Sequence, residues 1–226
     1  MTPGIIYYVT DVESTGLSSV YQEVTEISII RASDRHQLTE MVKCDYPERA
    51  NVDALRITNK TLADLSQGAT KEEVIGKVNR FINQDGMTPS DRCFVGHNVA
   101  FDRRFIHALY EKVGEVCPVN IWLDTIHLMK EFLKHADHSQ LKIVRTPKGK
   151  VSTTLQNCCD TIGIKKFAAA HASKVDTRNT YLLWKRLTEE KGIDHLPFHK
   201  SFPHYIKSTN DGPLEDIDNL DMSDVE

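Results

Sequence analysis

The sequence predicts an α/β domain with a mixed sheet, in which three antiparallel strands come first and parallel strands follow. Two observations support this prediction. Three segments rich in apolar, β-branched and aromatic residues follow one another near the start of the chain. After them, helical spacing of apolar residues alternates with short apolar runs, as in a sheet whose later strands are joined by helices.

The first three strands are expected at residues 5–12, 24–32 and 38–44. The next helix begins at Thr70, where Glu73 completes a capping box, and its apolar residues keep helical spacing to Phe81. Beyond it, we expect strands at 93–95 and 120–123 and helices at 99–113, 124–133, 154–162 and 176–191. Gly163 and Gly192 would end the last two helices, because glycine readily adopts the left-handed conformation that often follows a helix.

A basic segment at 142–152 differs from its surroundings. Pro147 and Gly149 favour a turn, and the residues on either side favour strands, so we expect a basic β-hairpin. Its basic residues are Lys142, Arg145, Lys148 and Lys150. These side chains could follow the backbone of a nucleic acid or form only a solvated surface, and the sequence leaves both interpretations open.

Length and composition favour one domain followed by a tail. The 226 residues include 40% hydrophobic and 27% charged residues, an ordinary balance for a globular protein. We expect the domain at 1–192 and an irregular extension at 193–226. From Asp211 onward, the extension carries seven acidic residues and no basic one, which predicts a disordered tail. The formal net charge of −4 arises in this tail, so the domain itself is not strongly acidic.

Composition also disfavours several classes of protein. Five cysteines without a C-x-x-C pair argue against a disulfide framework or a zinc site, and Cys158 and Cys159 are expected to be packing residues. No apolar run approaches the ~20 residues of a membrane helix. Residues 1–10 do not resemble a signal peptide. We therefore expect a cytoplasmic protein without membrane contact.

The motif Asp11-Val12-Glu13 stands at the end of the first predicted strand. Alternate side chains of a strand point to the same side, so Asp11 and Glu13 can share one site. Two carboxylates repel each other unless a cation lies between them, and hard divalent ions such as Mg²⁺ or Mn²⁺ prefer oxygen ligands. Taken alone, such a pair is more often a solvated strand end.

Two further motifs place acidic residues at the starts of predicted helices. In the segment 97–102, His-Asn-Val-Ala-Phe-Asp, Asp102 could add a third carboxylate from the first helical turn. In the segment 171–176, His-Ala-Ser-Lys-Val-Asp, Asp176 begins a long helix, and His171 lies just upstream in a predicted loop. Helix capping and a favourable charge near a helix N-terminus are the alternative explanations for both aspartates.

In this order, D-x-E-x-T-G, H-N-x-x-F-D and H-x-x-x-x-D resemble the motifs of the DEDDh 3′–5′ exonucleases. This family includes the epsilon proofreading subunit of bacterial replicative polymerases and ribonuclease T. The resemblance covers residues 5–191, and it implies a ribonuclease H-like sheet flanked by helices. Two departures are visible, since Ser14 stands where threonine is common and Arg56 replaces a usual glycine.

The resemblance also implies an active site. Its metal ligands, Asp11, Glu13, Asp102 and Asp176, would hold two divalent metal ions, Mg²⁺ or Mn²⁺, which clamp the scissile phosphate. His171 would act as the general base on the attacking water. The expected substrate contacts are the backbone of Thr15 and Gly16, the wedging side chain of Leu17, and His97 and Asn98.

The function implied by the resemblance is a 3′–5′ exonuclease that removes nucleoside monophosphates from single-stranded or frayed 3′ ends of DNA, in replication, proofreading or repair. Nucleic acid is the expected partner, and the extension at 193–226 could bind a DNA polymerase or another replication protein. The alternatives are an exoribonuclease that trims RNA, which no residue excludes, and a non-catalytic polymerase-associated subunit. The presence of all four carboxylates and the histidine argues against the second alternative.

Overall fold

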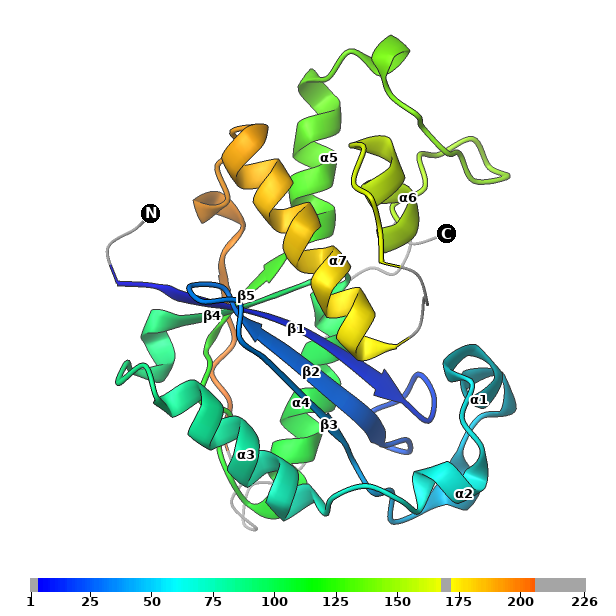
Figure 1. Ribbon diagram of the computed structural model, residues 1–226, viewed down its shortest axis with the longest axis vertical. Helices are drawn as coiled ribbons and strands as arrows, with labels where there is room; N and C mark the ends of the chain where they lie inside the picture. The colour runs from blue at the N-terminus through cyan, green and yellow to red at the C-terminus, as the bar shows by residue number, and fades with distance from the viewer. Residues whose placement is uncertain (1–3, 168–171, 206–226) are drawn as a thin grey trace.

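The computed structural model describes residues 4–167 and 172–205, which fold around a six-stranded mixed sheet (Figure 1). The strands lie in the order β3-β2-β1-β4-β5-β6. Their bounds are β1 Ile6–Ser14, β2 Val24–Arg31, β3 Gln37–Met41, β4 Arg92–Gly96, β5 Ile121–Asp124 and β6 Lys200–Ser201. β1, β2 and β3 are antiparallel, β1, β4 and β5 are parallel, and β6 is antiparallel to β5. The predicted mixed sheet is therefore confirmed.

Helices cover both faces of the sheet (Figure 1). Their bounds are α1 Val52–Thr58, α2 Leu62–Leu65, α3 Lys71–Asn83, α4 Val99–Val113, α5 Thr125–His135, α6 Leu155–Thr161 and α7 Ser173–Lys185. α3 and α4 pack on one face, where Phe105 shares a core with Val12 of β1. α5, α6 and α7 pack on the other face, where Leu128 and Leu183 share a second core with Val9.

The alternation of side chains along β1 decides where its acidic residues point. Val12 enters the core shared with α3 and α4, whereas Val9 enters the core shared with α5 and α7. Because side chains alternate along a strand, Asp11 and Glu13 continue the row that begins at Val9 and lie on the α7 side. β1 thereby places two carboxylates opposite the first turn of α7.

Three features differ from the sequence prediction. α1 and α2 stand where no element was predicted, and α1 buries none of its residues, so no apolar periodicity marks it. β6 has only two residues, too few to show any alternation. The hairpin predicted at 142–152 is reduced to a single antiparallel bridge between Arg145 and Val151 around a turn that begins at Pro147.

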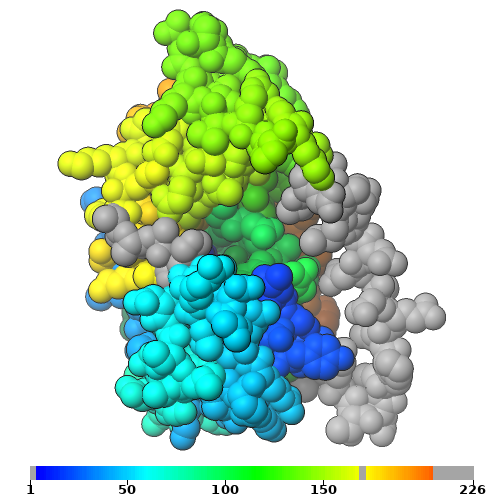
Figure 2. Space-filling view, turned by 90° about the vertical axis from the view of Figure 1, so that its right-hand side faces the viewer, coloured from blue at the N-terminus to red at the C-terminus, as the bar shows by residue number. Residues whose placement is uncertain are grey.

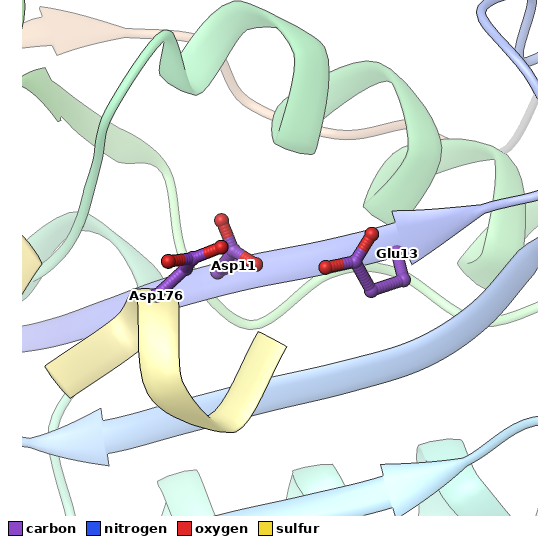
Figure 3. A group of neighbouring side chains, drawn as sticks. All are labelled: Asp11, Glu13 and Asp176. Atoms are coloured by element: carbon purple, nitrogen blue, oxygen red, sulfur yellow. The ribbon is translucent and has the colours of Figure 1, made fainter. Parts of the chain in front are cut away.

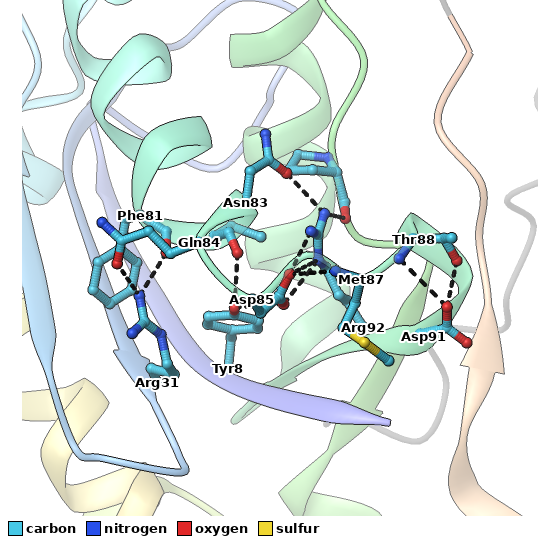
Figure 4. A network of polar contacts seen from close by, with 12 residues as sticks. Tyr8, Arg31, Phe81, Asn83, Gln84, Asp85, Met87, Thr88, Asp91 and Arg92 are labelled. Carbon is cyan, nitrogen blue, oxygen red and sulfur yellow. Dashed lines mark hydrogen bonds and ion pairs between the residues drawn. The ribbon is translucent and has the colours of Figure 1, made fainter. Parts of the chain in front are cut away.

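A buried ion pair lies near the amino ends of β1 and β4 (Figure 4). Arg92, which is 2% exposed, donates to both carboxylate oxygens of Asp85, with a shortest distance of 2.6 Å. The Tyr8 hydroxyl donates to Asp85 Oδ2 at 2.8 Å, and Asn83 Oδ1 accepts from Arg92 at 2.9 Å. Burial alone would raise the pKa of Asp85, but the hydrogen bonds from Arg92, the Met87 N–H and Tyr8 lower it.

Part of the C-terminal extension packs on the domain. The Phe202 N–H donates to Asn120 O at 2.8 Å, and the Arg103 guanidinium lies 3.9 Å from the centroid of the Phe202 ring. His204 is 5% exposed, and its Nδ1 accepts from the Cys117 N–H at 3.0 Å. The acidic tail predicted to be disordered, residues 211–226, lies outside the described residues, and the domain boundary at 192 stays a prediction.

All five cysteines are free and buried, in agreement with the packing role predicted for Cys158 and Cys159. None of the described helices is both long and apolar enough to cross a membrane.

Candidate active site

Three carboxylates from two elements meet near the carboxyl end of β1 (Figure 3). Asp11 and Glu13 leave the same side of β1, and Asp176 comes from the first turn of α7. Oxygen atoms of all three lie within 4.8 Å of one another. α7 begins at Ser173, so Asp176 does not cap the helix and instead points from its first turn toward β1.

Asp102 approaches the same region from α4 but is turned toward the backbone of β1. Its Oδ1 accepts a hydrogen bond from the Val12 N–H at 2.9 Å, and the residue is only 3% exposed. The pairing of β1 with β4 ends at Val9 and Val95, which leaves this N–H to a side chain. The structure therefore groups three of the four predicted metal ligands, and Asp102 lies close enough for its charge to raise the pKa of Asp11.

The acidic cluster, defined as Asp11, Glu13, Asp102 and Asp176, brings four carboxylates into one partly buried region, and the pKa values of three of them are raised. Burial raises the pKa of Asp11, and the charges of Asp102, Glu13 and Asp176 raise it further. Burial, followed by the charge of Asp176, raises the pKa of Glu13 to about 7. Burial likewise raises the pKa of Asp102. Divalent cations would reverse these shifts, and a ligand set made only of oxygen atoms fits Mg²⁺ or Mn²⁺.

Glu26 of β2 is an acidic neighbour that the sequence motifs did not reveal. It pairs with Glu13 in the register of β1 and β2, and its charge raises the pKa of both Asp11 and Glu13. Its Oε1 accepts from Ser173 Oγ at 2.6 Å, and its Oε2 accepts from Lys60 Nζ at 3.4 Å. Glu26 therefore attaches the start of α7 to the sheet. No sequence motif marks Glu26, because only the register of β1 against β2 in the folded sheet brings it opposite Glu13.

The start of α4 is held by Asp124 of β5. Asp124 Oδ1 accepts from the N–H groups of Asn98 and Ile126, and Oδ2 accepts from the Val99 N–H, all at 2.9–3.0 Å. Asn98 adopts a left-handed φ of 63°, and its side chain makes no capping hydrogen bond. Helix capping was the alternative explanation for the motif at 97–102, but Asp124, not the Asn98 side chain, caps α4. The Asn98 side chain is exposed at the edge of the site.

His97 uses both ring nitrogens within the protein. Its Nδ1 lies 2.8 Å from Thr125 Oγ1, and its Nε2 lies 2.7 Å from the Thr153 carbonyl oxygen. Burial lowers the pKa of His97, and Nε2 donates to Thr153 because a carbonyl oxygen can only accept, while the Thr125 hydroxyl also donates to Gly96 O at 3.1 Å. His97 therefore joins the start of α4 to the segment before α6, and its direct contact with substrate stays a prediction.

The residues predicted to contact the terminal nucleotide follow β1. Thr15 is 1% exposed, and its Oγ1 accepts from the Glu23 N–H at 2.9 Å while its carbonyl accepts from the Asn51 N–H at 2.8 Å. These bonds close a loop and attach it to the start of α1. A Cβ at Gly16 would lie 2.7 Å from the Gln22 side chain, so a larger residue there would require that side chain to move. Leu17, by contrast, is 83% exposed.

An open pocket of about 270 Å³, here called the nucleoside pocket, lies between this loop, α1 and the first turn of α4. Leu17, Ile57 and Phe101 supply its apolar wall, and Glu13 links it to the acidic cluster. Figure 2 shows that this face is hollowed between the cyan and blue residues at the bottom and the yellow-green residues at the top. An aromatic and aliphatic wall beside carboxylates suits a nucleobase and its sugar.

His171, the predicted general base, lies outside the described residues. The described chain resumes at Ala172, directly before α7, so His171 precedes the ligand-bearing turn of α7 in the sequence. Its catalytic role stays a prediction.

Comparisons with known proteins agree with the motifs. A family model described as Exonuclease (RNase T) matches residues 8–184, which include the whole acidic cluster. The PolC-type DNA polymerase III of Listeria monocytogenes is 28% identical over 202 residues, which are 88% of this chain and 12% of that protein. The PolC-type DNA polymerase III of Staphylococcus haemolyticus is 29% identical over 134 residues, which are 57% of this chain and 9% of that protein. The chain thus spans a small part of these relatives.

Solved structures share the fold. Escherichia coli Exonuclease I in complex with a dT13 oligonucleotide has a TM-score of 0.68 at 16% identity, covering 83% of this chain and 42% of that chain. Exonuclease I from Methylocaldum szegediense has a TM-score of 0.64 at 21% identity, covering 83% of this chain and 41% of that chain. These likenesses confirm the ribonuclease H-like arrangement of the sheet. Because the family model extends from β1 through α7, this chain belongs to the exonuclease family of nucleases, as its motifs predicted.

Proposed function

We propose that this protein is a 3′–5′ exonuclease that removes nucleoside monophosphates one at a time from the 3′ end of DNA. The observation that carries the proposal is the meeting of Asp11, Glu13 and Asp176 within 4.8 Å, next to the nucleoside pocket. Hydrolysis at the end of a strand needs both features, because the terminal nucleoside must be held while its phosphate lies at the reacting centre.

The acidic cluster provides the ligands for two divalent metal ions, Mg²⁺ or Mn²⁺. Bound there, such ions would supply positive charge to the scissile phosphate and to the leaving oxygen. Asp11, Glu13 and Asp176 offer converging oxygen atoms, and the hydrogen bond from the Val12 N–H fixes the orientation of Asp102. The raised pKa values of Asp11 and Glu13 support this assignment, since a bound cation would stabilise the charged forms of both groups.

The remaining residues bind the strand end and move a proton. Leu17, Ile57 and Phe101 hold the terminal nucleoside, and the exposed Leu17 wedges against the preceding base, which favours single-stranded or frayed ends. His171 accepts the proton of the attacking water, a role suited to an imidazole whose ordinary pKa lies near neutrality.

The relatives support DNA as the substrate. Those described above are named DNA polymerase III, and one structural neighbour was solved with a dT13 oligonucleotide. We include in the proposal a role in DNA replication, proofreading or repair, and contact between the 193–226 extension and a polymerase or another replication protein.

The test uses 5′-labelled single-stranded DNA, a 3′-mismatched primer–template and the matching RNA, each with Mg²⁺ or Mn²⁺. We expect a ladder of single-nucleotide steps from the 3′ end, strongest on the DNA substrates. The double variant Asp11→Asn/Glu13→Gln should lose roughly 10³-fold or more of the rate, because metal ligation is worth several kcal/mol of barrier. Glu131→Gln, a surface carboxylate on α5, is the matched control and should keep full activity.

Three results would change the proposal. A stronger ladder on RNA would replace DNA degradation with RNA trimming. The absence of a ladder on every substrate with either metal would remove the exonuclease proposal and favour a non-catalytic subunit. Activity retained in the double variant would remove the acidic cluster from the mechanism.

A further inference from the structure

A second and larger pocket, of about 410 Å³, lies beside the start of α4. Asn98 and His97 line it on one side, Lys130 of α5 lines it on another, and the segment 146–154 closes it. The nucleoside pocket is lined by Phe101, one helical turn further along α4. The first turn of α4 therefore lies between the two pockets.

The second pocket is also connected to the acidic cluster. Thr154, which lines the pocket, is the N-cap of α6. In the first turn of α6, Gln156 Nε2 donates to Asp176 Oδ1 at 3.4 Å. Asn98 and Asp102 belong to the same turn of α4. A strand whose terminal nucleoside occupies the first pocket, with its phosphate at the acidic cluster, can therefore continue into the second.

The charge of the segment that closes the pocket is opposite to that of the whole chain. Residues 138–159, which include the closing segment 146–154, contain the four basic residues of the predicted hairpin and no carboxylate. The formal net charge of the whole chain is −4. The structure separates these basic residues, because Arg145 Nη1 donates to Gly149 O at 2.9 Å whereas Lys150 lines the pocket. Among the described residues, neither Lys150 nor Lys130 takes part in an ion pair.

The segment is held in shape before any ligand binds. The Thr146 N–H donates to Lys150 O at 2.8 Å, the Ser152 N–H donates to Val144 O at 2.8 Å, and His97 Nε2 donates to Thr153 O at 2.7 Å. Thr146 Oγ1, on a residue that lines the pocket, is buried and lacks a hydrogen-bond partner among the described residues. A buried hydroxyl without a partner is unfavourable, and a polar ligand would satisfy it.

The lining indicates which part of a nucleic acid fits. Its described residues include two lysines, an asparagine amide and several hydroxyl groups, but no Phe, Tyr or Trp on which a base could stack. Lysine binds phosphate as a point charge and hydroxyls donate to phosphate oxygens, so the lining suits a sugar–phosphate backbone.

We propose that the second pocket binds the sugar–phosphate backbone of the single strand upstream of the scissile bond, with Lys130 and Lys150 each neutralising one backbone phosphate. This inference rests on the proposed exonuclease function and deepens it. Because the contacts go to the backbone, the pocket favours longer strands without favouring a base sequence.

The test compares the full chain with its Lys130→Ala/Lys150→Ala variant on substrates of increasing length. The shortest substrate is the p-nitrophenyl ester of thymidine 5′-monophosphate, which reaches only the nucleoside pocket and the acidic cluster. We expect the variant to keep its kcat/KM on this ester and to lose roughly tenfold on a long single strand, through a higher KM. A plot of log KM against the logarithm of the salt concentration should have a smaller slope for the variant than for the wild type. The expected difference is about 1.4, from ~0.7 for each of the two lost phosphate contacts on a single strand.

The matched control is Lys112→Ala/Lys134→Ala, which removes the same charge from α4 and α5 outside the second pocket, and it should behave as the wild type. An equal loss on the ester and on the long strand would overturn the inference, as would no loss on either or an equal loss in the control. If the wild-type protein cleaves neither substrate, the proposed function fails instead, so the two failures are distinguishable.

Discussion

Two clusters of charged side chains lie toward opposite ends of β1, and they differ in the direction in which the pKa values of their carboxyl groups are shifted. Near the amino end, Asp85 receives hydrogen bonds from Arg92 and Tyr8, and its pKa is lowered. Near the carboxyl end, Asp11 and Glu13 lie among other carboxylates, and their pKa values are raised. One strand thus joins a cluster in which the pKa of a carboxyl group is lowered to a cluster in which the pKa values of carboxyl groups are raised.

The difference separates a structural use of buried charge from a functional one. A buried ion pair whose remaining hydrogen bonds are satisfied costs little in the folded state, but either partner alone is strongly unfavourable. Partly buried carboxylates that lie close together repel one another, and a cation bound between them relieves this repulsion. The fold therefore depends on both partners of the amino-end cluster. Bound cations would stabilise the acidic cluster.

The largest expected effect breaks the amino-end cluster. Replacing Arg92 with methionine leaves Asp85 buried without its cation, so we expect the free energy of unfolding to fall by about 3–5 kcal/mol. Urea denaturation monitored by circular dichroism measures this loss. Asp11→Asn is the contrasting variant, and in metal-free buffer it should cost nothing or stabilise the protein, because it removes a repelling charge. Equal losses in the two variants would show that Asp11 has a structural partner.

Metal addition should act only on the acidic cluster. At a Mg²⁺ or Mn²⁺ concentration of 100 times Kd, binding to the folded state adds about 2.7 kcal/mol to the free energy of unfolding. For a chain of this size, that corresponds to a rise in Tm of roughly 5–11 °C. Differential scanning calorimetry with and without EDTA measures the shift. It should disappear in Asp176→Asn and persist in Glu131→Gln, and a shift that survives in Asp176→Asn would place the ions elsewhere.

The metal-free protein should lose stability as the pH rises. The pKa of Glu13 is raised from the ordinary 4.5 to about 7, so between these values the folded state keeps a proton that the unfolded state has released. The free energy of unfolding then falls with pH, by up to about 1.4 kcal/mol per pH unit for one proton. Glu13→Gln removes the part of this slope that Glu13 contributes, whereas the raised pKa values of Asp11 and Asp102 act in the same direction and remain until metal is bound.

This measurement needs a comparison in identical buffers. Burial lowers the pKa of His107 to about 3, and this shift changes stability in the opposite direction, reducing it as the pH falls below 6.5. The difference between wild type and Glu13→Gln isolates the carboxylate. A difference that is flat from pH 4.5 to 7 would show that Glu13 titrates normally.

The same contrast explains how much could be predicted from the sequence. Asp11 and Glu13 were identifiable because strand alternation is a local rule, and the family motifs supplied Asp102 and Asp176. Glu26 was missed because only the register of β1 against β2 brings it opposite Glu13, and register is set by the packed sheet rather than by local sequence. The pair of Asp85 and Arg92 was missed because it depends on the contact between the end of α3 and the start of β4.

The helices and strands could likewise be predicted only where a local sequence pattern marks them. Helices with a continuous apolar face, such as α3 and α4, lie close to their predicted positions. α1 was missed because it buries no residue, and β6 because a two-residue strand has no period. Tertiary contact creates the second pocket as well, since the Thr153 carbonyl and His97 are far apart in the sequence and meet only in the fold.

The smallest expected effect sharpens the comparison, because it removes Lys60, a cation whose charge acts on Glu13. Lys60 lies 3.4 Å from Glu26 and lowers the pKa of Glu13. In Lys60→Met, the pH of half-maximal metal binding, read from the metal-induced rise in Tm, should increase by about 0.1–0.7 unit, the equivalent of ~0.2–1 kcal/mol. Lys77→Met, which removes a similar ion pair with Glu40 of β3, should leave it unchanged. A larger shift would mean that Lys60 partly balances the acidic cluster, which would then resemble the cluster at the other end of β1.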